Sequence, residues 1–200
     1  LIVCVNDYFK NDIGWHNLQN LLTHFDLDSF IFNPEMNVYK ELVRTSLRKH
    51  NHILWPFISL HTSFPVHVAL ERRIPLVVWG QNQSVEQVGK CSHYDSIEMS
   101  NWSRHEHDLK KISQKGVTGL YLSNYYSWDP LLQNRKAMEQ GFVAELNKAS
   151  FDPYERAGSS VYYGIHDLLK YKRLGYRKAR DQLVREIRHN RISREKAIEL

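Results

Sequence analysis

The sequence has little cysteine and no segment built to cross a membrane. Its 200 residues include only Cys4 and Cys91, and no C-x-x-C pair. Two isolated cysteines give neither a disulfide framework nor a zinc-ligand spacing. No apolar run reaches the roughly 18 residues of a membrane span, and no secretory leader precedes the first apolar run. These absences predict a cytoplasmic protein with no membrane partner.

Several catalytic motifs are also absent. The chain contains no phosphate loop of the G-x-x-x-x-G-K-[ST] type, no G-x-G-x-x-G dinucleotide fingerprint and no G-x-S-x-G nucleophile elbow. Histidine is plentiful, but neither His105-Glu106-His107 nor Cys91-Ser92-His93 has the H-E-x-x-H spacing of a helix-borne zinc site. Alternate residues of a helix do not face each other, so no metal site is predicted.

Both ends of the sequence lie inside regular patterns. The chain opens on the apolar run Leu1–Val5 without a methionine, and it closes inside the helical pattern of residues 193–200. No glycine or proline stop follows that last pattern. Both ends are therefore expected to be cuts through secondary structure, as in a fragment.

The positive charge is concentrated near the C-terminus. The net charge is +5, while residues 165–200 hold eleven Lys/Arg and five Asp/Glu, a local balance of +6 that leaves −1 for residues 1–164. A basic helical face can serve RNA, a phosphorylated substrate or an acidic partner. A solvated helix surface explains the same charge pattern equally well.

The first 80 residues alternate between strand and helix patterns. The runs 1–5, 29–32 and 74–79 predict strands. The first is expected to be a buried parallel strand and ends at Asn6-Asp7, and the last ends at Gly80. Helical spacing predicts helices over 15–25, with Asp12 as its cap, over 38–47 and around 66–70. This order favours an α/β fold with a parallel sheet.

The rest of the chain is predicted to be mainly helical. Residues 81–103 read as a long polar loop, and helices are expected around 109–112 and over 131–140, 164–174 and 177–189. The predicted division places an α/β core in residues 1–150 and a basic helical region in residues 151–200. In an open parallel sheet, ligands bind beyond the carboxyl ends of the strands, which here carry Asn6-Asp7 and Gly80-Gln81-Asn82.

Four blocks, in order, resemble one protein family. Residues 74–82, IPLVVWGQN, are similar to its IPLIIWGEN element, and residues 125–129, YYSWD, to its Y-x-P-W-D block, which continues through Asn134, Ala137 and Gly141-Phe142. Residues 165–176, IHDLLKYKRLGY, and 191–197, RISREKA, resemble its IHDYLK and GRITREEA elements. The family is that of the N-acetyl sugar amidotransferases of lipopolysaccharide and flagellin-glycan biosynthesis, within the PP-loop ATP pyrophosphatase superfamily. The resemblance covers almost the whole chain.

The resemblance implies an ATP-dependent enzyme that converts a sugar acetamido group into an acetamidino group. It implies a Rossmann-like parallel sheet of the adenine nucleotide alpha hydrolase type, ATP and Mg²⁺ as cofactors, and a sugar or nucleotide-sugar substrate. It also implies ammonia-supplying partners, a glutaminase and a cyclase-like subunit, and makes nucleic acid an improbable partner.

The resemblance assigns roles to individual residues. Gln81 and Asp129 are the expected catalytic residues, and Asn6, Asp7, Gly80 and Asn82 are expected to bind the nucleotide. The expected substrate-binding residues are Tyr125, Trp128, Lys170, Arg173 and Asp181.

The chain departs from the family pattern in several places. The S-G-G-x-D-S phosphate loop, which in the family precedes the position of Leu1, is not in this sequence, so the central strand between the first and third strands of this chain is missing too. Gln81 stands where the family usually has Glu, and Ser127 where it has Pro. Residues 154–158 also differ from the block that the family has at the corresponding position. This sequence alone is therefore expected to be inactive.

Two other functions stay open. The first is a PP-loop ATPase that modifies tRNA, with the basic helices of residues 165–200 binding phosphates. The second is a truncated, non-catalytic paralogue that serves as a subunit of a glycan-modifying complex, which the Gln81 change favours.

Overall fold

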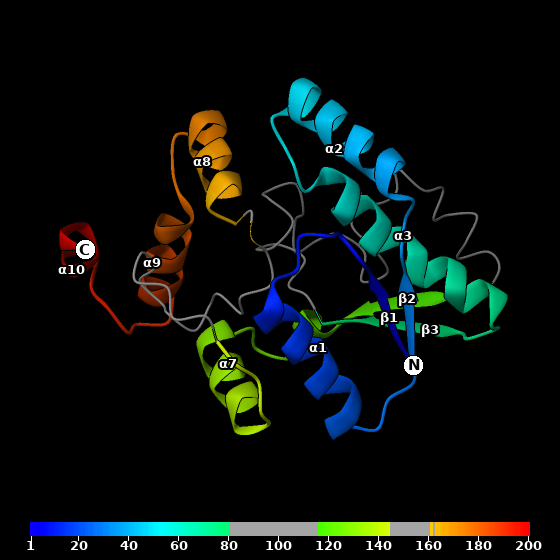
Figure 1. Cartoon of the computed structure of the whole chain (residues 1–200). Helices are drawn as coiled ribbons and strands as arrows, with labels where there is room; N and C mark the ends of the chain where they lie inside the picture. The colour runs from blue at the N-terminus through cyan, green and yellow to red at the C-terminus, as the bar shows by residue number, and fades with distance from the viewer. Residues whose placement is uncertain (81–115, 145–160, 162) are drawn as a thin grey trace. The chain divides into compact units, whose positions relative to one another are not determined.

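The computed structural model describes residues 1–80, 116–144, 161 and 163–200 (Figure 1). The strands are β1 (Ile2–Val5), β2 (Ser29–Phe32), β3 (Leu76–Trp79) and β4 (Thr118–Tyr121). The helices are α1 (Asp12–His24), α2 (Met36–His50), α3 (Trp55–Glu71), α7 (Pro130–Glu139), α8 (Tyr163–Leu174), α9 (Lys178–Arg188) and α10 (Arg194–Glu199), with a 3-10 turn η1 (Leu122–Asn124).

Most of the predicted elements are present. The three strand predictions correspond to β1, β2 and β3, and the helix predictions correspond to α1, α2, α3, α7, α8 and α9. The predicted cap of α1 is wrong: Asn11 is the N-cap, its Oδ1 accepting a hydrogen bond from the Gly14 amide at 2.9 Å, while Asp12 is the first helical residue. Both side chains suit a cap, and the backbone at Asn11 decided between them. The helix expected around 109–112 lies outside the described residues.

The strands pair in parallel, in two separate sheets. β1 pairs with β2 with Val5 opposite Phe32, and β3 pairs with β4 with Trp79 opposite Tyr121. Within the described residues, no hydrogen bonds join β1 to β3. The sequence did not predict β4, whose TGLY segment is short and contains a glycine.

The chain divides into two compact units. The first comprises residues 1–5, 29–39 and 55–129, and the second comprises residues 6–28, 40–54 and 130–200. This division does not follow the boundary predicted near residue 150, because the second unit also takes in α1 and most of α2.

Helix α3 organises the first unit. It packs against both β1 and β3, and its Val66 and Ala69 join Trp79, Val117 and Tyr121 in a buried apolar cluster. β3 alternates: Val77 and Trp79 face this cluster, while Leu76 and Val78 are 45% and 51% exposed. β3 therefore has one buried and one exposed face among the described residues.

In the second unit, α1 is clasped to the end of α7 by asparagine side chains. Asn17 forms two hydrogen bonds with the Val143 backbone, donating to its carbonyl at 2.9 Å and accepting from its amide at 2.8 Å. Asn20 Nδ2 donates to the Gln140 carbonyl at 2.8 Å. These bonds complete backbone groups that the end of a helix leaves unpaired.

No single helix among the described residues combines the length and apolar composition of a membrane span; only α2 and α3 together, bent by 119°, meet such a criterion.

Candidate functional site

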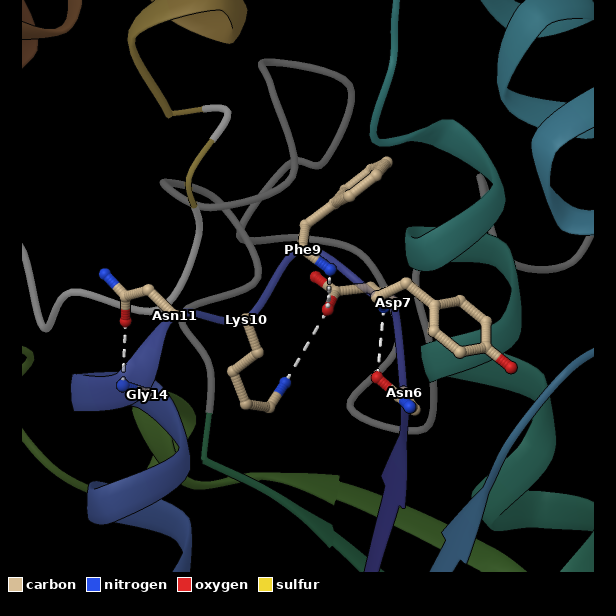
Figure 2. A network of polar contacts seen from close by, with 7 residues as sticks. Asn6, Asp7, Phe9, Lys10, Asn11 and Gly14 are labelled. Carbon is tan, nitrogen blue, oxygen red and sulfur yellow. Dashed lines mark hydrogen bonds and ion pairs between the residues drawn. The ribbon is translucent and has the colours of Figure 1, made fainter. Parts of the chain in front are cut away.

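The turn after β1 is organised by its own side chains (Figure 2). Asn6 Oδ1 accepts a hydrogen bond from the Tyr8 amide at 3.0 Å, and Asp7 Oδ1 accepts one from the Phe9 amide at 3.1 Å. Such bonds to a backbone amide two residues ahead are typical of Asx turns, which Asn and Asp favour. Tyr8 lies in the left-handed region, with φ of 58°. The sequence Asn6-Asp7 thus builds this turn directly.

Asp7 keeps one oxygen available for a ligand. Its side chain is 5% exposed, and Lys10 Nζ lies 3.8 Å from the same Oδ1 that binds the Phe9 amide. Lys10 is itself held over the Trp15 ring, 5.4 Å from its centroid. No described residue donates to Asp7 Oδ2. A fixed carboxylate oxygen of this kind accepts a hydrogen bond from a hydroxyl or an amine, which fits the expected contact with a nucleoside.

A second set of predicted residues follows the carboxyl edge of β3 and β4 in the first unit. The register places Trp79 beside Tyr121, so Gly80 and Leu122 leave the sheet at the same edge. Apart from its chain neighbours, no described residue has an atom within 4 Å of the position that a Cβ on Gly80 would take. Among the described residues there is thus room for a ligand to approach the Gly80 backbone.

Two indole N–H groups of the first unit have no acceptor in the described part of the chain. Trp79 is 5% exposed and Trp128 is half-buried, and Nε1 of each is buried without a hydrogen-bond partner. A buried donor without an acceptor costs about 1–3 kcal/mol, and such groups are rare unless water or a ligand supplies an acceptor. These two donors are the clearest sign of a ligand site in the first unit.

The remaining predicted residues of this segment differ in exposure. Asp129 is 9% exposed, while Tyr125 is 57% exposed. Asp129 is thus a nearly buried carboxylate one residue from Trp128, whereas the Tyr125 ring is open to solvent. Gln81 and Asn82 lie outside the described residues, and Asn6 and Asp7 belong to the second unit.

Two of the three C-terminal candidate residues contact each other. Lys170 Nζ forms an ion pair with Asp181, and it also lies 4.9 Å from the centroid of the Tyr176 ring. Lys170 is therefore committed to joining α8 to α9. Arg173 is exposed, and no described carboxylate pairs with it. Of the three, Arg173 is the best placed to meet an external anion.

The carboxylates of the described residues do not build a metal centre. No group of three His, Cys, Asp or Glu side chains converges there. The described residues therefore do not fit a protein-held Mg²⁺ ion, which normally needs several oxygen ligands in octahedral geometry.

One open hollow of about 260 Å³ lies in the second unit, lined by Asp12, Ile13, His16 and Val143. None of these residues was predicted to bind a ligand. Its lining is mainly apolar, so it offers a ligand few polar contacts.

Sequence reasoning missed Trp79 as a site residue. Trp79 stacks on Tyr121 with 6.3 Å between ring centroids, and the His61 ring of α3 lies 6.0 Å from that of Trp79. The available signal was an aromatic residue in the last position of a strand, directly before Gly80. The pairing with Tyr121 was not predictable, because β4 itself was not.

Comparison with known proteins gives one match. Residues 148–200 match a family described as LPS biosynthesis protein WbpG-like, C-terminal domain. No curated protein matches the chain. The match covers about a quarter of the sequence and supports a link to a lipopolysaccharide biosynthesis family.

Proposed function

We propose that the protein takes part in converting the acetamido group of a sugar into an acetamidino group. The match to a lipopolysaccharide biosynthesis family is the starting point of this proposal. The observation that carries the proposal is that the first unit holds two buried indole donors, of Trp79 and Trp128, for which no described residue supplies an acceptor, and that the nearly buried Asp129 follows Trp128 in the sequence. Aromatic faces combined with a few fixed polar groups are typical of sites for small ligands. A sugar offers hydroxyl and carbonyl oxygens to the indoles and hydroxyl donors to the carboxylate.

The reaction requires ATP because an amide is a poor electrophile. In the proposed sequence, the amide oxygen attacks the α-phosphorus of ATP and pyrophosphate leaves. Ammonia then adds to the activated carbon, AMP departs with the former amide oxygen, and a proton is lost to give the amidine. A glutaminase and a cyclase-like subunit are the proposed source of ammonia. Magnesium carried by the ATP phosphates would supply charge neutralisation for the pyrophosphate, and no described residue is assigned to hold it.

The two separate sheets support a proposal for the fold. A single parallel sheet in the order β2, β1, inserted strand, β3, β4 would use the edges of β1 and β3 that no described strand covers. α3 already packs against both β1 and β3. We place the phosphate loop of a PP-loop enzyme at the carboxyl end of that inserted strand, where backbone N–H groups at a helix N-terminus bind phosphate.

The described residues take the following proposed roles. In the second unit, Asp7 Oδ2 accepts a hydrogen bond from a nucleoside. In the first unit, Gly80, which Gln81 and Asn82 follow in the sequence, lets a ligand approach the backbone. Trp128 and Asp129 hold the sugar.

The test is Asp129→Asn in a version of the protein that includes the phosphate loop. Replacing a charged acceptor weakens its hydrogen bonds by about 1.5–3 kcal/mol, so turnover with the sugar should fall by roughly 10- to 100-fold. The measurement is pyrophosphate release with ATP, ammonium and a panel of nucleotide-linked acetamido sugars.

The matched control is Asp28→Asn, because Asp28 is an exposed carboxylate on the loop before β2. Its turnover should equal that of the unaltered protein. Unchanged turnover and sugar affinity in Asp129→Asn would remove Asp129 from the site. Absence of pyrophosphate release with every sugar in the unaltered protein would overturn the proposed function itself.

A further inference from the structure

Helix α9 presents one exposed side that is rich in arginine. Arg177, Arg180, Val184 and Arg188, here called the arginine face, are all exposed, and their spacing places them within one stripe along the helix. The opposite side of α9 buries Gln182 and Glu186, at 3% and 4% exposure. The orientation of α9 is therefore fixed by its buried polar side, and the arginines face outward.

The three arginines have no anionic partner in the described part of the chain, although neighbouring cations do. Lys170 pairs with Asp181, Arg185 and Arg191 pair with Glu186, and Lys196 pairs with Glu199. The carboxylates of Asp181, Glu186 and Glu199 thus already form ion pairs with other cations. The positive charge of the arginine face remains uncompensated.

Aromatic rings hold two of these arginines in place. The Arg177 guanidinium lies 5.5 Å from the centroid of the Tyr171 ring, and the Arg180 guanidinium lies 5.1 Å from that of Tyr176. A cation–π contact of this kind restricts the side chain while leaving its N–H donors available. Binding to a partner then costs less side-chain entropy.

An apolar strip on α8 continues the arginine face. Ile165, Leu168 and Tyr171 lie on successive turns of the helix and are 49%, 45% and 48% exposed. Tyr171 joins the two surfaces through its contact with Arg177. Together they form a mixed surface of aliphatic, tyrosine and arginine side chains.

The composition of this surface decides between classes of ligand. The arginine face alone extends about 16 Å, which is much longer than one diphosphate group. Nucleic-acid surfaces are polar and basic, whereas three half-exposed apolar side chains beside tyrosine and arginine are typical of a protein interface. Its charge is complementary to carboxylates, since residues 165–200 carry a balance of +6.

We infer that the arginine face and the α8 strip together dock an acidic surface of another protein, with apolar contacts on α8 and carboxylates on α9. The identity of this partner rests on the proposed function, in which a separate subunit delivers ammonia. Charge complementarity of this type increases the rate and the specificity of association.

The experiment measures binding of the purified glutaminase and cyclase-like subunits to the protein by biolayer interferometry. The test variant is Arg180→Glu with Arg188→Glu, and Arg188→Ala is a milder second variant. The control is Arg48→Glu with Lys49→Glu, which reverses two exposed cations on α2. Circular dichroism checks that each variant is folded.

We expect the test variant to bind at least about tenfold more weakly, the Arg188→Ala variant to weaken binding by a smaller factor, and the control to bind normally. Equal binding of the test and control variants overturns the inference, and so does a lack of binding by the unaltered protein. Tighter binding of an RNA of about 20 nucleotides than of the subunits, at about 150 mM salt, would make the surface a nucleic-acid site instead.

Turnover separates this inference from the proposed function. These turnover measurements use the version of the protein that includes the phosphate loop. With free ammonium chloride, the test variant in that version should release pyrophosphate as fast as the same version without the substitutions, while its glutamine-dependent turnover falls. Subunit binding without any ammonium-dependent turnover in the unaltered protein would overturn the proposed function and leave the docking surface intact.

Discussion

The structure gives a reason for the glycine at position 141. Its φ is +86°, and a Cβ added there would lie 2.8 Å from Asn20 Oδ1. Asn20 is held in that position by its hydrogen bond to the Gln140 carbonyl. The family resemblance flagged Gly141 as part of a motif, and the structure adds the reason: the left-handed turn and the asparagine clasp both need glycine.

Replacing Gly141 with Ala should therefore destabilise the second unit by about 2–3 kcal/mol, of which roughly 1 kcal/mol is the backbone cost of the left-handed conformation. The matched control is Gly175→Ala, because Gly175 has a similar φ of +78° but open space around its Cβ position. Urea unfolding of both variants measures the difference. Equal losses of stability would show that Asn20 moves aside without cost.

The candidate ligand-binding residues differ in whether they are already paired. Among the described residues, the indole N–H groups of Trp79 and Trp128 have no acceptor, whereas Lys170, which the sequence also predicted to bind substrate, forms an ion pair with Asp181. The sequence shows which side chains can act, but a side chain that is already paired inside the protein is a poor ligand group.

At the scale of elements, Glu186 joins α9 to the segment that leads into α10. Its carboxylate accepts hydrogen bonds from Arg185 at 3.0 Å and from Arg191 at 2.9 Å. Burial alone would raise the pKa of Glu186, but the hydrogen bonds and charges of Arg191 and Arg185 outweigh it and hold the pKa below its ordinary value of 4.5. The folded state therefore favours the ionised carboxylate.

This lowered pKa predicts a pH-dependent stability. The contribution of Glu186 is present above pH 4.5 and is lost as the pH falls through the lower, folded-state pKa, because the group must then be protonated in the folded state too. Glu186→Gln should cost about 1–2 kcal/mol at neutral pH and progressively less in acid. Urea midpoints measured across this pH range test the prediction.

The control for this prediction is Glu199→Gln, because Glu199 forms a solvent-exposed ion pair with Lys196. Exposed pairs contribute little, so its midpoint should stay near that of the unaltered protein at every pH. A loss of stability in Glu186→Gln that does not change with pH would mean that packing, and not charge, explains the effect.

At the scale of the whole molecule, the proposed strand order makes a prediction about the edges of β1 and β3 that no described strand covers. A strand edge without a neighbour leaves backbone N–H and C=O groups unpaired. In the 200-residue chain, amides of β1 and β3 that point away from β2 and β4 should exchange quickly with solvent. In a version extended upstream by the phosphate-loop strand, the same amides should become protected.

Amide hydrogen exchange followed by NMR distinguishes the two cases. Amides of β1 that bond to β2, and of β4 that bond to β3, serve as internal controls and should be protected in both proteins. Rapid exchange of the outward amides in the extended protein would contradict the proposed strand order β2, β1, inserted strand, β3, β4.

The sequence by itself determined the local elements of this protein. Apolar spacing at Trp15, Leu18 and Leu22 predicts α1, and the short apolar runs predict β1, β2 and β3, because helix and strand periods are written in neighbouring residues. The basic charge of α8–α10 was visible for the same reason. Asn6-Asp7 also builds its turn through hydrogen bonds to amides only two residues away.

Only the tertiary structure decided which of these features meet. The pairing of β3 with β4 joins segments about 40 residues apart, and the glycine in the short TGLY run gave no strand signal of its own. The surroundings of a side chain likewise depend on distant neighbours. They join Lys170 to Asp181, and among the described residues they provide no acceptor for the Trp79 and Trp128 indoles and no carboxylate for Arg177, Arg180 and Arg188. Long-range contacts of this kind are set by packing of the whole chain, which no local pattern encodes.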